Sequence, residues 1–283
     1  MARRTVAGLW KSSHPGPTLV VTALAAGLSV AAELDLWRIA VLTVAVCAGQ
    51  LSIGISNDTM DAQRDRAVGR TDKPIARNEV TTATAWTASL VCLLLALGLS
   101  APLGAGLLAA HAVVLASGWA YNAGLKAGRL SIAPYILAFG VFPSLATLAS
   151  SEPQLAASWA WLTGGALGAA LHLTNVLPDL DDDARTGVRG LPHRMGSGFW
   201  AAAAAAAAVL VGALAATAGP AGAELSEISA LSWLVFGLVA ALVLLTLGLA
   251  RAGIAGRSLF RLVMLAALLL VAQLVASGQS LFG

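Results

Sequence analysis

Charged residues are scarce in this sequence, at 11% of 283 residues, and cysteine is scarcer still, with two copies. Cys47 and Cys92 both fall within apolar runs and have no metal-ligand spacing, so we expect neither disulfides nor a thiolate metal site. The formal net charge of +3 is too small to indicate binding to nucleic acid. With 58% hydrophobic residues and a mean hydropathy of +0.81, this composition excludes an ordinary soluble domain and predicts an integral membrane protein in a lipid bilayer.

Apolar runs of about twenty residues recur along the chain, and an α-helix of that length crosses a hydrocarbon core ~30 Å thick. Polar and apolar residues do not alternate with a period of two, which disfavours a transmembrane β-barrel. The sequence therefore predicts an all-α polytopic membrane protein with nine transmembrane helices. Their expected ranges are Thr18–Ala32, Leu36–Ser56, Thr81–Leu99, Leu103–Tyr121, Ser131–Ala149, Ser158–Leu177, Phe199–Ala218, Ser229–Ala250 and Ser258–Ser277.

The basic residues predict how these helices are oriented. Of the 17 Lys and Arg residues, all except Arg38 fall at the N-terminus or in loops on one side of the predicted membrane. Because cytoplasmic loops are enriched in Lys and Arg, we expect the N-terminus and the charged loops to be cytoplasmic and the C-terminus to be outside.

Two long loops on the basic side are similar to each other without a gap, at an offset of 118 residues. The first motif spans 57–74 and the second spans 175–192. We interpret 1–283 as one transmembrane domain made by duplication, with two related four-helix units followed by a final helix. The matching residues are Asn57 and Asn175, Asp61 and Asp179, Asp65 and Asp183, Gly69 and Gly187, and Pro74 and Pro192.

Each motif begins where an apolar run ends, and its first three matching residues carry oxygen ligands at intervals of four residues. If the helix continues through each motif, these three side chains share one helical face. Carboxylates at this spacing repel one another unless a cation compensates them. Oxygen ligands select a hard cation, so the two ladders predict a shared Mg²⁺ site. The alternative is a pair of solvated loops. Basic residues beside the carboxylates favour a polyphosphate ligand, whose charge is neutralised from two sides.

The sequence "NDTMDAQRD" (Asn57–Asp65) resembles the NDxxDxxxD signature of the UbiA superfamily of intramembrane prenyltransferases. "DLDDD" (Asp179–Asp183) resembles the second motif of that family, DxxxD, and "YNAGLK" (Tyr121–Lys126) also matches its layout. The resemblance covers nearly the whole chain. It implies an all-helical fold around a central cavity, binding of Mg²⁺ and a prenyl diphosphate on the cytoplasmic side, and transfer of an isoprenoid chain to an acceptor.

The resemblance and the charge pattern together predict the site residues. The predicted catalytic residues are Asp61, Asp65, Asp179 and Asp183. The predicted Mg²⁺ ligands are Asn57, Asp58, Asp61, Asp65, Asn175, Asp179 and Asp183. The predicted diphosphate contacts are Arg66, Arg70, Lys73 and Lys126, with Arg77 and Arg189 as weaker candidates.

Polar residues deeper in the apolar runs are candidates for contact with the acceptor. His172 and Gln50 precede the two motifs on the stripes that carry them, although a neutral histidine bonded to a neighbouring helix is an equal alternative for His172. His111 has no such alignment and is expected to be structural. Many family members carry Arg-Pro where this sequence has His14-Pro15, so the acceptor side departs from the family pattern.

Three functions are compatible with these features. The leading prediction is a Mg²⁺-dependent prenyltransferase that joins an isoprenoid chain to a small acceptor, for which an aromatic compound is one candidate. The alternative with the same metal site is a membrane terpene cyclase, in which the allylic cation closes on its own double bonds without an acceptor. A secondary transporter is disfavoured, because its charged sites would lie near the bilayer midplane and not at helix ends. The acceptor and the isoprenoid length are not marked by any motif.

Overall fold

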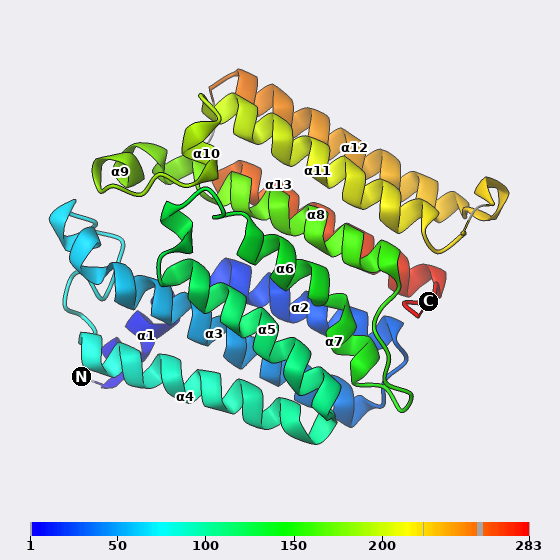
Figure 1. Cartoon of the computed structure of the whole chain (residues 1–283), viewed down its shortest axis with the longest axis horizontal. Helices are drawn as coiled ribbons and strands as arrows, with labels where there is room; N and C mark the ends of the chain where they lie inside the picture. The colour runs from blue at the N-terminus through cyan, green and yellow to red at the C-terminus, as the bar shows by residue number, and fades with distance from the viewer. Residues whose placement is uncertain (1, 223, 254–256, 283) are drawn as a thin grey trace.

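The fold, seen in a computed structural model that describes residues 2–222, 224–253 and 257–282, is a bundle of helices (Figure 1). These ranges contain no β-strand, and one isolated bridge pairs Ala156 with Phe282. The helices are α1 (Ala2–Ser12), α2 (Pro15–Ala31), α3 (Leu36–Ala67), α4 (Thr82–Ser100), α5 (Ala105–Asn122), α6 (Ala133–Val141), α7 (Pro143–Leu148), α8 (Ser158–Asn175), α9 (Leu180–Arg185), α10 (Leu191–Arg194), α11 (Gly198–Ala218), α12 (Ala230–Arg251) and α13 (Arg257–Ser277). Short 3₁₀ turns are η1 (Ala101–Leu103), η2 (Leu125–Ala127), η3 (Leu177–Asp179) and η4 (Leu225–Glu227).

Six helices form a closed ring. Going round it, α2 packs on α3, α3 on α5, α5 on α6, α6 on α8, α8 on α13, and α13 returns to α2. Outside the ring, α4 packs on α3, α11 packs on α8, and α12 packs on α11 and α13, so that α4 and the pair α11 and α12 form the two edges of Figure 1. The helices α2 and α13, which lie near the two ends of the chain, are therefore neighbours.

The outer helices direct apolar side chains away from the bundle. Leu94 on α4 is 68% exposed and Leu244 on α12 is 69% exposed, which fits contact with lipid and not with water. Within the part of the chain that the structure describes, five helices are each long and apolar enough to cross a membrane, and α1 and α2 form a further candidate pair bent by 69°. The all-helical prediction is thus confirmed over the described residues, whereas nine membrane crossings and the two four-helix units stay predictions.

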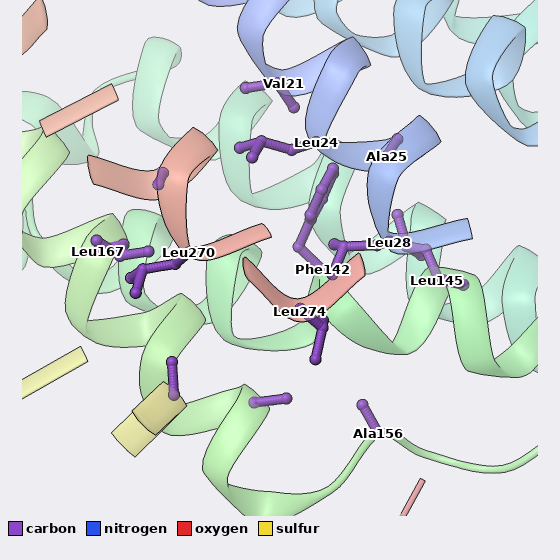
Figure 2. Close-up of a cluster of buried hydrophobic side chains, with 14 of the residues drawn as sticks. Val21, Leu24, Ala25, Leu28, Phe142, Leu145, Ala156, Leu167, Leu270 and Leu274 are labelled. Carbon is purple, nitrogen blue, oxygen red and sulfur yellow. The ribbon is translucent and has the colours of Figure 1, made fainter. Parts of the chain in front are cut away.

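The expected helix Ser131–Ala149 corresponds to one apolar helical segment, Ala133–Leu148, that is interrupted at a single residue. The structure divides it into α6 and α7 at Phe142, because Pro143 has no N–H to donate to the carbonyl of Phe139. Ser144 then fixes the new helix, since its hydroxyl oxygen accepts hydrogen bonds from Trp161 Nε1 (2.9 Å) and from the backbone N–H of Ala156 (3.1 Å). The break sits in the apolar core that Figure 2 shows around Phe142.

Glycines bring α6 and α8 into backbone contact. A Cβ at Gly164 would clash with the carbonyl oxygen of Phe139, and a Cβ at Gly168 would lie 2.5 Å from that of Tyr135. Small residues at such crossings let membrane helices approach closely. The rings of Tyr135 and Phe139 therefore hold fixed positions on the inner side of the bundle.

The charged motifs gather at one end of the bundle. Figure 1 shows α9, α10 and the segment that follows α3 at the end opposite the C-terminus. Arg38 lies at the other end, where its Nη1 donates to the carbonyl of Ala149 at 2.6 Å. Arg38, which the sequence places on the opposite side of the membrane from the other basic residues, thus lies at the opposite end of the bundle from the charged motifs.

Replacing Gly164 by alanine should destabilise the fold by about 1–3 kcal/mol, because overpacking forces α6 and α8 apart. Thermal unfolding in detergent measures this. Gly98→Ala is the matched control, since Gly98 lies in α4 and a Cβ there would meet no atom within 4 Å, and that change should be neutral or slightly stabilising. Equal unfolding temperatures for the two variants would contradict the packing described for α6 and α8.

Candidate active site

The first motif lies on an uninterrupted helix, as the spacing predicts. The helix α3 continues to Ala67, so Asn57, Asp61 and Asp65 are stacked on one face, and Asp58 lies beside them. The three carboxylates are buried, with Asp61 the most exposed of them at 9%. Such burial of like charges requires compensation from other elements.

The second motif does not form the helical ladder that its spacing predicts. The helix α8 ends at Asn175, Leu177–Asp179 forms a 3₁₀ turn, and α9 starts at Leu180. Pro178 is the cause, because it removes a backbone donor and its ring clashes with the preceding turn. The expectation that Asn175, Asp179 and Asp183 share one helical face is therefore wrong, and with it the single stripe drawn from His172.

Both motifs nevertheless face the same cavity. A cavity of ≈ 710 Å³ lies inside the six-helix ring and is lined by side chains from every helix of it. Its polar end contains all the predicted metal ligands, which are Asn57, Asp58, Asp61, Asp65, Asn175, Asp179 and Asp183. The turn at Pro178 thus changes the direction of the acids in the second motif, but they still line the same cavity as the acids of the first motif.

Basic side chains from distant segments neutralise these acids. Lys126 Nζ lies 2.5 and 2.6 Å from the two carboxylate oxygens of Asp61. Arg64 connects the motifs, at 2.9 Å from Asp61 and 3.7 Å from Asp183. Arg70 also reaches the second motif, with its Nη1 3.0 Å from Asp179 Oδ1. Arg64 thus pairs with a carboxylate of each motif, and Arg70 ties the loop after α3 to the second motif.

Arg70 is itself held by a second carboxylate, Asp72, at 2.9 and 3.0 Å. The hydrogen bonds between them are the main cause of a raised pKa for Arg70 and a lowered pKa for Asp72. Arg257 at the start of α13 continues this chain of charges, 3.5 Å from Asp72. The final helix thereby contributes to the polar end of the cavity. We call this end, which contains both acidic motifs, the mouth.

Asp58 has a different surrounding from the other acids of its motif. One of its oxygens contacts both Lys73 Nζ (2.5 Å) and His14 Nε2 (2.9 Å). His14 reaches it because Gly54, one turn earlier on α3, leaves room for the backbone of Ser13. His14 also adopts a left-handed backbone, with φ 54°, which is uncommon for a residue with a side chain.

Burial shifts the ionisation of two groups at the mouth. It raises the pKa of Asp183 to about 6, against the opposing effect of Arg64 and with a further contribution from Asp179. Burial also lowers the pKa of Lys126, and the adjacent Asp61 opposes that shift. Both groups therefore lie where water is partly excluded and charges interact strongly.

The donor set suits a hard cation, but it is not arranged as a closed metal site. Among the described residues, no group of three or more acidic, His or Cys side chains converges on one point. Asp65, however, lines the cavity at 5% exposure and makes no ion pair within the described chain. Carboxylate and amide oxygens around a wet cavity match the ligands that Mg²⁺ takes together with phosphate and water. The residues present fit Mg²⁺ bound with a substrate.

Of the four best predicted diphosphate contacts, three line the cavity and Arg66 does not. Arg66 points away and donates to the carbonyls of Ile75 and Ala76 and to Asn78, so it holds the loop instead. Arg77 and Arg189 also lie outside the described lining. The prediction for Arg66 is therefore corrected: it supports the loop that carries Lys73.

Sequence reasoning overlooked several cations that do line the cavity. They are Lys11, Arg64, Arg257 and Arg261, and the imidazole of His14 lies beside them. Arg64 follows Asp61 by three residues, so helical spacing alone could have identified it. No comparable signal marks Arg257 and Arg261, because their place depends on α13 packing beside α2.

The deep part of the cavity is apolar and aromatic. His172 and Gln50 both line it, as predicted, and His172 is fully buried with its Nε2 3.0 Å from Ser131 Oγ. The His172 ring packs against Tyr121 and Tyr135, and its Nδ1 has no partner among the described residues. His111 is structural, bonded to Ser100 Oγ at 2.7 Å. The cavity thus has a charged mouth and an apolar interior.

Comparison with known proteins agrees with this architecture. A structure of a UbiA homolog from Archaeoglobus fulgidus bound to GPP and Mg²⁺ matches with a TM-score of 0.73 at 14% identity, over 95% of this chain and 98% of that one. The apo structure of a UbiA homolog from Aeropyrum pernix K1 matches with a TM-score of 0.76 at 18% identity, over 93% and 98%. A digeranylgeranylglyceryl phosphate synthase structure matches with a TM-score of 0.69 at 13% identity, over 97% and 98%.

At these identities the structures establish the fold alone, and no curated protein matches the sequence. The family assignment rests on a direct match of residues 17–269 to the model of the UbiA prenyltransferase family. That match covers most of the chain, including both motifs and all six helices of the ring in whole or in large part. The chain therefore belongs to the UbiA prenyltransferase family.

Proposed function

We propose that this protein is a Mg²⁺-dependent intramembrane prenyltransferase that moves an isoprenoid chain from an allylic diphosphate to a small acceptor. The observation that carries the proposal is the single cavity with two acidic motifs and several cations at one end and an apolar interior at the other. A charged diphosphate and an apolar chain are the two halves of one such substrate. The relatives bound to GPP or DMAPP with Mg²⁺ support the same reading.

The basic residues at the mouth are suited to hold the diphosphate. In the absence of substrate they neutralise carboxylates, as Lys126 and Arg64 do for Asp61. When bound, Mg²⁺ supplies positive charge that compensates the carboxylates and stabilises a departing diphosphate. The proposed ligands to it are Asn57, Asp61, Asp65, Asn175, Asp179 and Asp183. Lys126, Arg64, Arg70 and Lys73 can then turn their N–H groups to phosphate oxygens.

We leave Asp58 out of this ligand set. Its carboxylate already has two partners, Lys73 and His14, from segments that frame the mouth. In this proposal Asp58 orients Lys73 and His14, while Asp61, Asp65, Asp179 and Asp183 carry the catalytic function predicted from the sequence. His172 and Gln50 remain the proposed contacts for the acceptor.

The proposed reaction breaks the bond between the allylic carbon and the diphosphate oxygen. The electron pair of that bond leaves with the diphosphate through the charged mouth. A nucleophilic atom of the acceptor forms the new bond to the allylic carbon and releases its proton to water. We propose that the mouth faces the cytoplasm, on the basis of the basic loops around it.

A terpene cyclase is the second candidate, and the aromatic lining favours it. Tyr121, Tyr135, Phe139 and Phe142 follow one another from the middle of the cavity inwards, with neighbouring ring centroids 5.1 to 6.3 Å apart. Aromatic faces stabilise cations, including a carbocation that migrates along a chain. The cyclase would use the same mouth without an acceptor.

Incubation of purified protein with Mg²⁺ and allylic diphosphates, with and without a membrane extract, tests both candidates. We expect diphosphate release that requires Mg²⁺, stops with a chelator, and produces a prenylated product only when the extract supplies an acceptor. Asp61→Asn and Asp179→Asn should each reduce turnover about a hundredfold or more, because each removes charge that stabilises the reacting groups. Glu79→Gln, at a pair with Arg77 outside the cavity, is the control. Cyclic products without extract would establish the cyclase, and full activity in both Asp variants would overturn the site.

Arg64 and Arg66 provide a matched pair of substitutions two residues apart. Arg64→Ala should raise the KM for the allylic diphosphate by about ten- to a hundredfold, because it removes a charge-assisted contact worth about 1.5–3 kcal/mol. Arg66→Ala should leave KM nearly unchanged and lower the unfolding temperature, because Arg66 supports the loop. Steady-state kinetics and thermal unfolding of both variants measure this, and the reverse pattern would contradict the assignment.

A further inference from the structure

The main cavity is followed by a second, smaller one. This second cavity of ≈ 70 Å³ has an almost wholly apolar lining. The two cavities share residues, so they adjoin. The residues that line both cavities, which we call the partition, are Leu24, Phe139, Phe142, Leu171 and Ala267.

The order of lining residues along two helices gives the direction from one cavity to the other. Along α2, Pro15 beside His14 lines the first cavity, Leu24 lies at the partition, and Leu28 lines the second cavity. On α13, Arg261 precedes Ala267 at the partition, and Leu274 follows it. The second cavity therefore continues the first, away from the charged mouth and along the axis that an isoprenoid chain would follow.

Phe142 is the most buried aromatic side chain of the partition, at 5% exposure. Figure 2 shows it between Leu24 and Leu28 of α2 and Leu274 of α13. Its backbone is the junction of α6 and α7, which is held by Pro143 and by the two hydrogen bonds to Ser144. On one side its ring lies 6.2 Å from that of Phe139, whose backbone is packed against Gly164. The Phe142 side chain is therefore closely packed between the two cavities.

We propose that Phe142 is the floor of the substrate cavity and limits the length of the isoprenoid chain that the protein accepts. The inference rests on the proposed function, since it assumes that the cavity holds an isoprenoid. An isoprene unit beyond the floor has to displace a packed aromatic ring, whereas one that ends at the floor is fully buried. Hydrophobic pockets discriminate between chains that differ by a few carbons about tenfold or more.

The test compares Mg²⁺-dependent binding of geranyl, farnesyl and geranylgeranyl thiolodiphosphates, which resist ionisation, to wild-type protein and to Phe142→Ala. The wild type should bind best the chain that reaches the floor and lose about tenfold or more for the next longer one. Phe142→Ala joins the two cavities, so the preferred length should increase by at least one isoprene unit. Ala267→Leu adds volume at the same partition and should move the preference toward shorter chains.

Leu145→Ala is the matched control. Leu145 is 2% exposed and lies near Phe142 in Figure 2, but it lines neither cavity among the described residues. It should lower the unfolding temperature about as Phe142→Ala does and keep the wild-type order of affinities. Phe142→Leu provides a milder change if the alanine variant does not fold, and it should shift the preference in the same direction.

The outcomes separate this inference from the function on which it rests. An unchanged order of affinities in both Phe142 variants, or a wild type with no length preference, would overturn the floor while leaving the prenyl diphosphate site intact. Absence of Mg²⁺-dependent binding for every chain in every protein would instead contradict the proposed function.

Discussion

The arrangement of the whole molecule depends on neutralising the negative charge of several carboxylates at one end of the helical bundle. Asp58 and Asp61 are buried on α3, and their partners come from the chain before α2, from the loop after α3 and from the turn after α5. Arg64 and Arg70 extend the same network to the acids that follow α8. Removing one partner of a buried pair commonly costs about 3–5 kcal/mol, so these contacts constrain how the elements meet. The same network leaves the mouth ready to exchange internal ion pairs for a metal and a diphosphate.

The first motif could be predicted in detail from the sequence because nothing interrupts its helix. Asn57, Asp61 and Asp65 needed only the helical period, and the structure follows it. The break in the second motif could also be predicted from the sequence, because Pro178 stands between Asn175 and Asp179 and proline interrupts a helix. The equal spacing of the two motifs favours a helical ladder in both, but this proline is present only in the second motif and overrides that spacing. Arg66 is close to the motif along the chain, but its direction around the helix takes it away from the cavity and toward the loop at Ile75–Asn78.

Other features depend on contacts between distant segments and had no local signal. Arg257 and Arg261 reach the mouth because α13 closes the ring beside α2. His14 reaches Asp58 because Gly54 leaves space for another segment. The floor at Phe142 results from a proline break, two glycines of α8 and the hydrogen bonds of Ser144 acting together. One cavity thus depends on electrostatic interactions at its mouth and on steric packing at its floor.

In the proposed function, the two acidic motifs act on one metal-bound substrate, although only the first motif is a helical ladder. A crystal structure with Mn²⁺ in place of Mg²⁺ and a geranyl thiolodiphosphate tests this most directly, because anomalous scattering locates Mn²⁺ without ambiguity. The account predicts Mn²⁺ at the charged mouth with ligands from both α3 and the η3–α9 segment, and the diphosphate contacted by Lys126 and Arg64. Mn²⁺ bound by one motif alone, or outside the cavity, would contradict it.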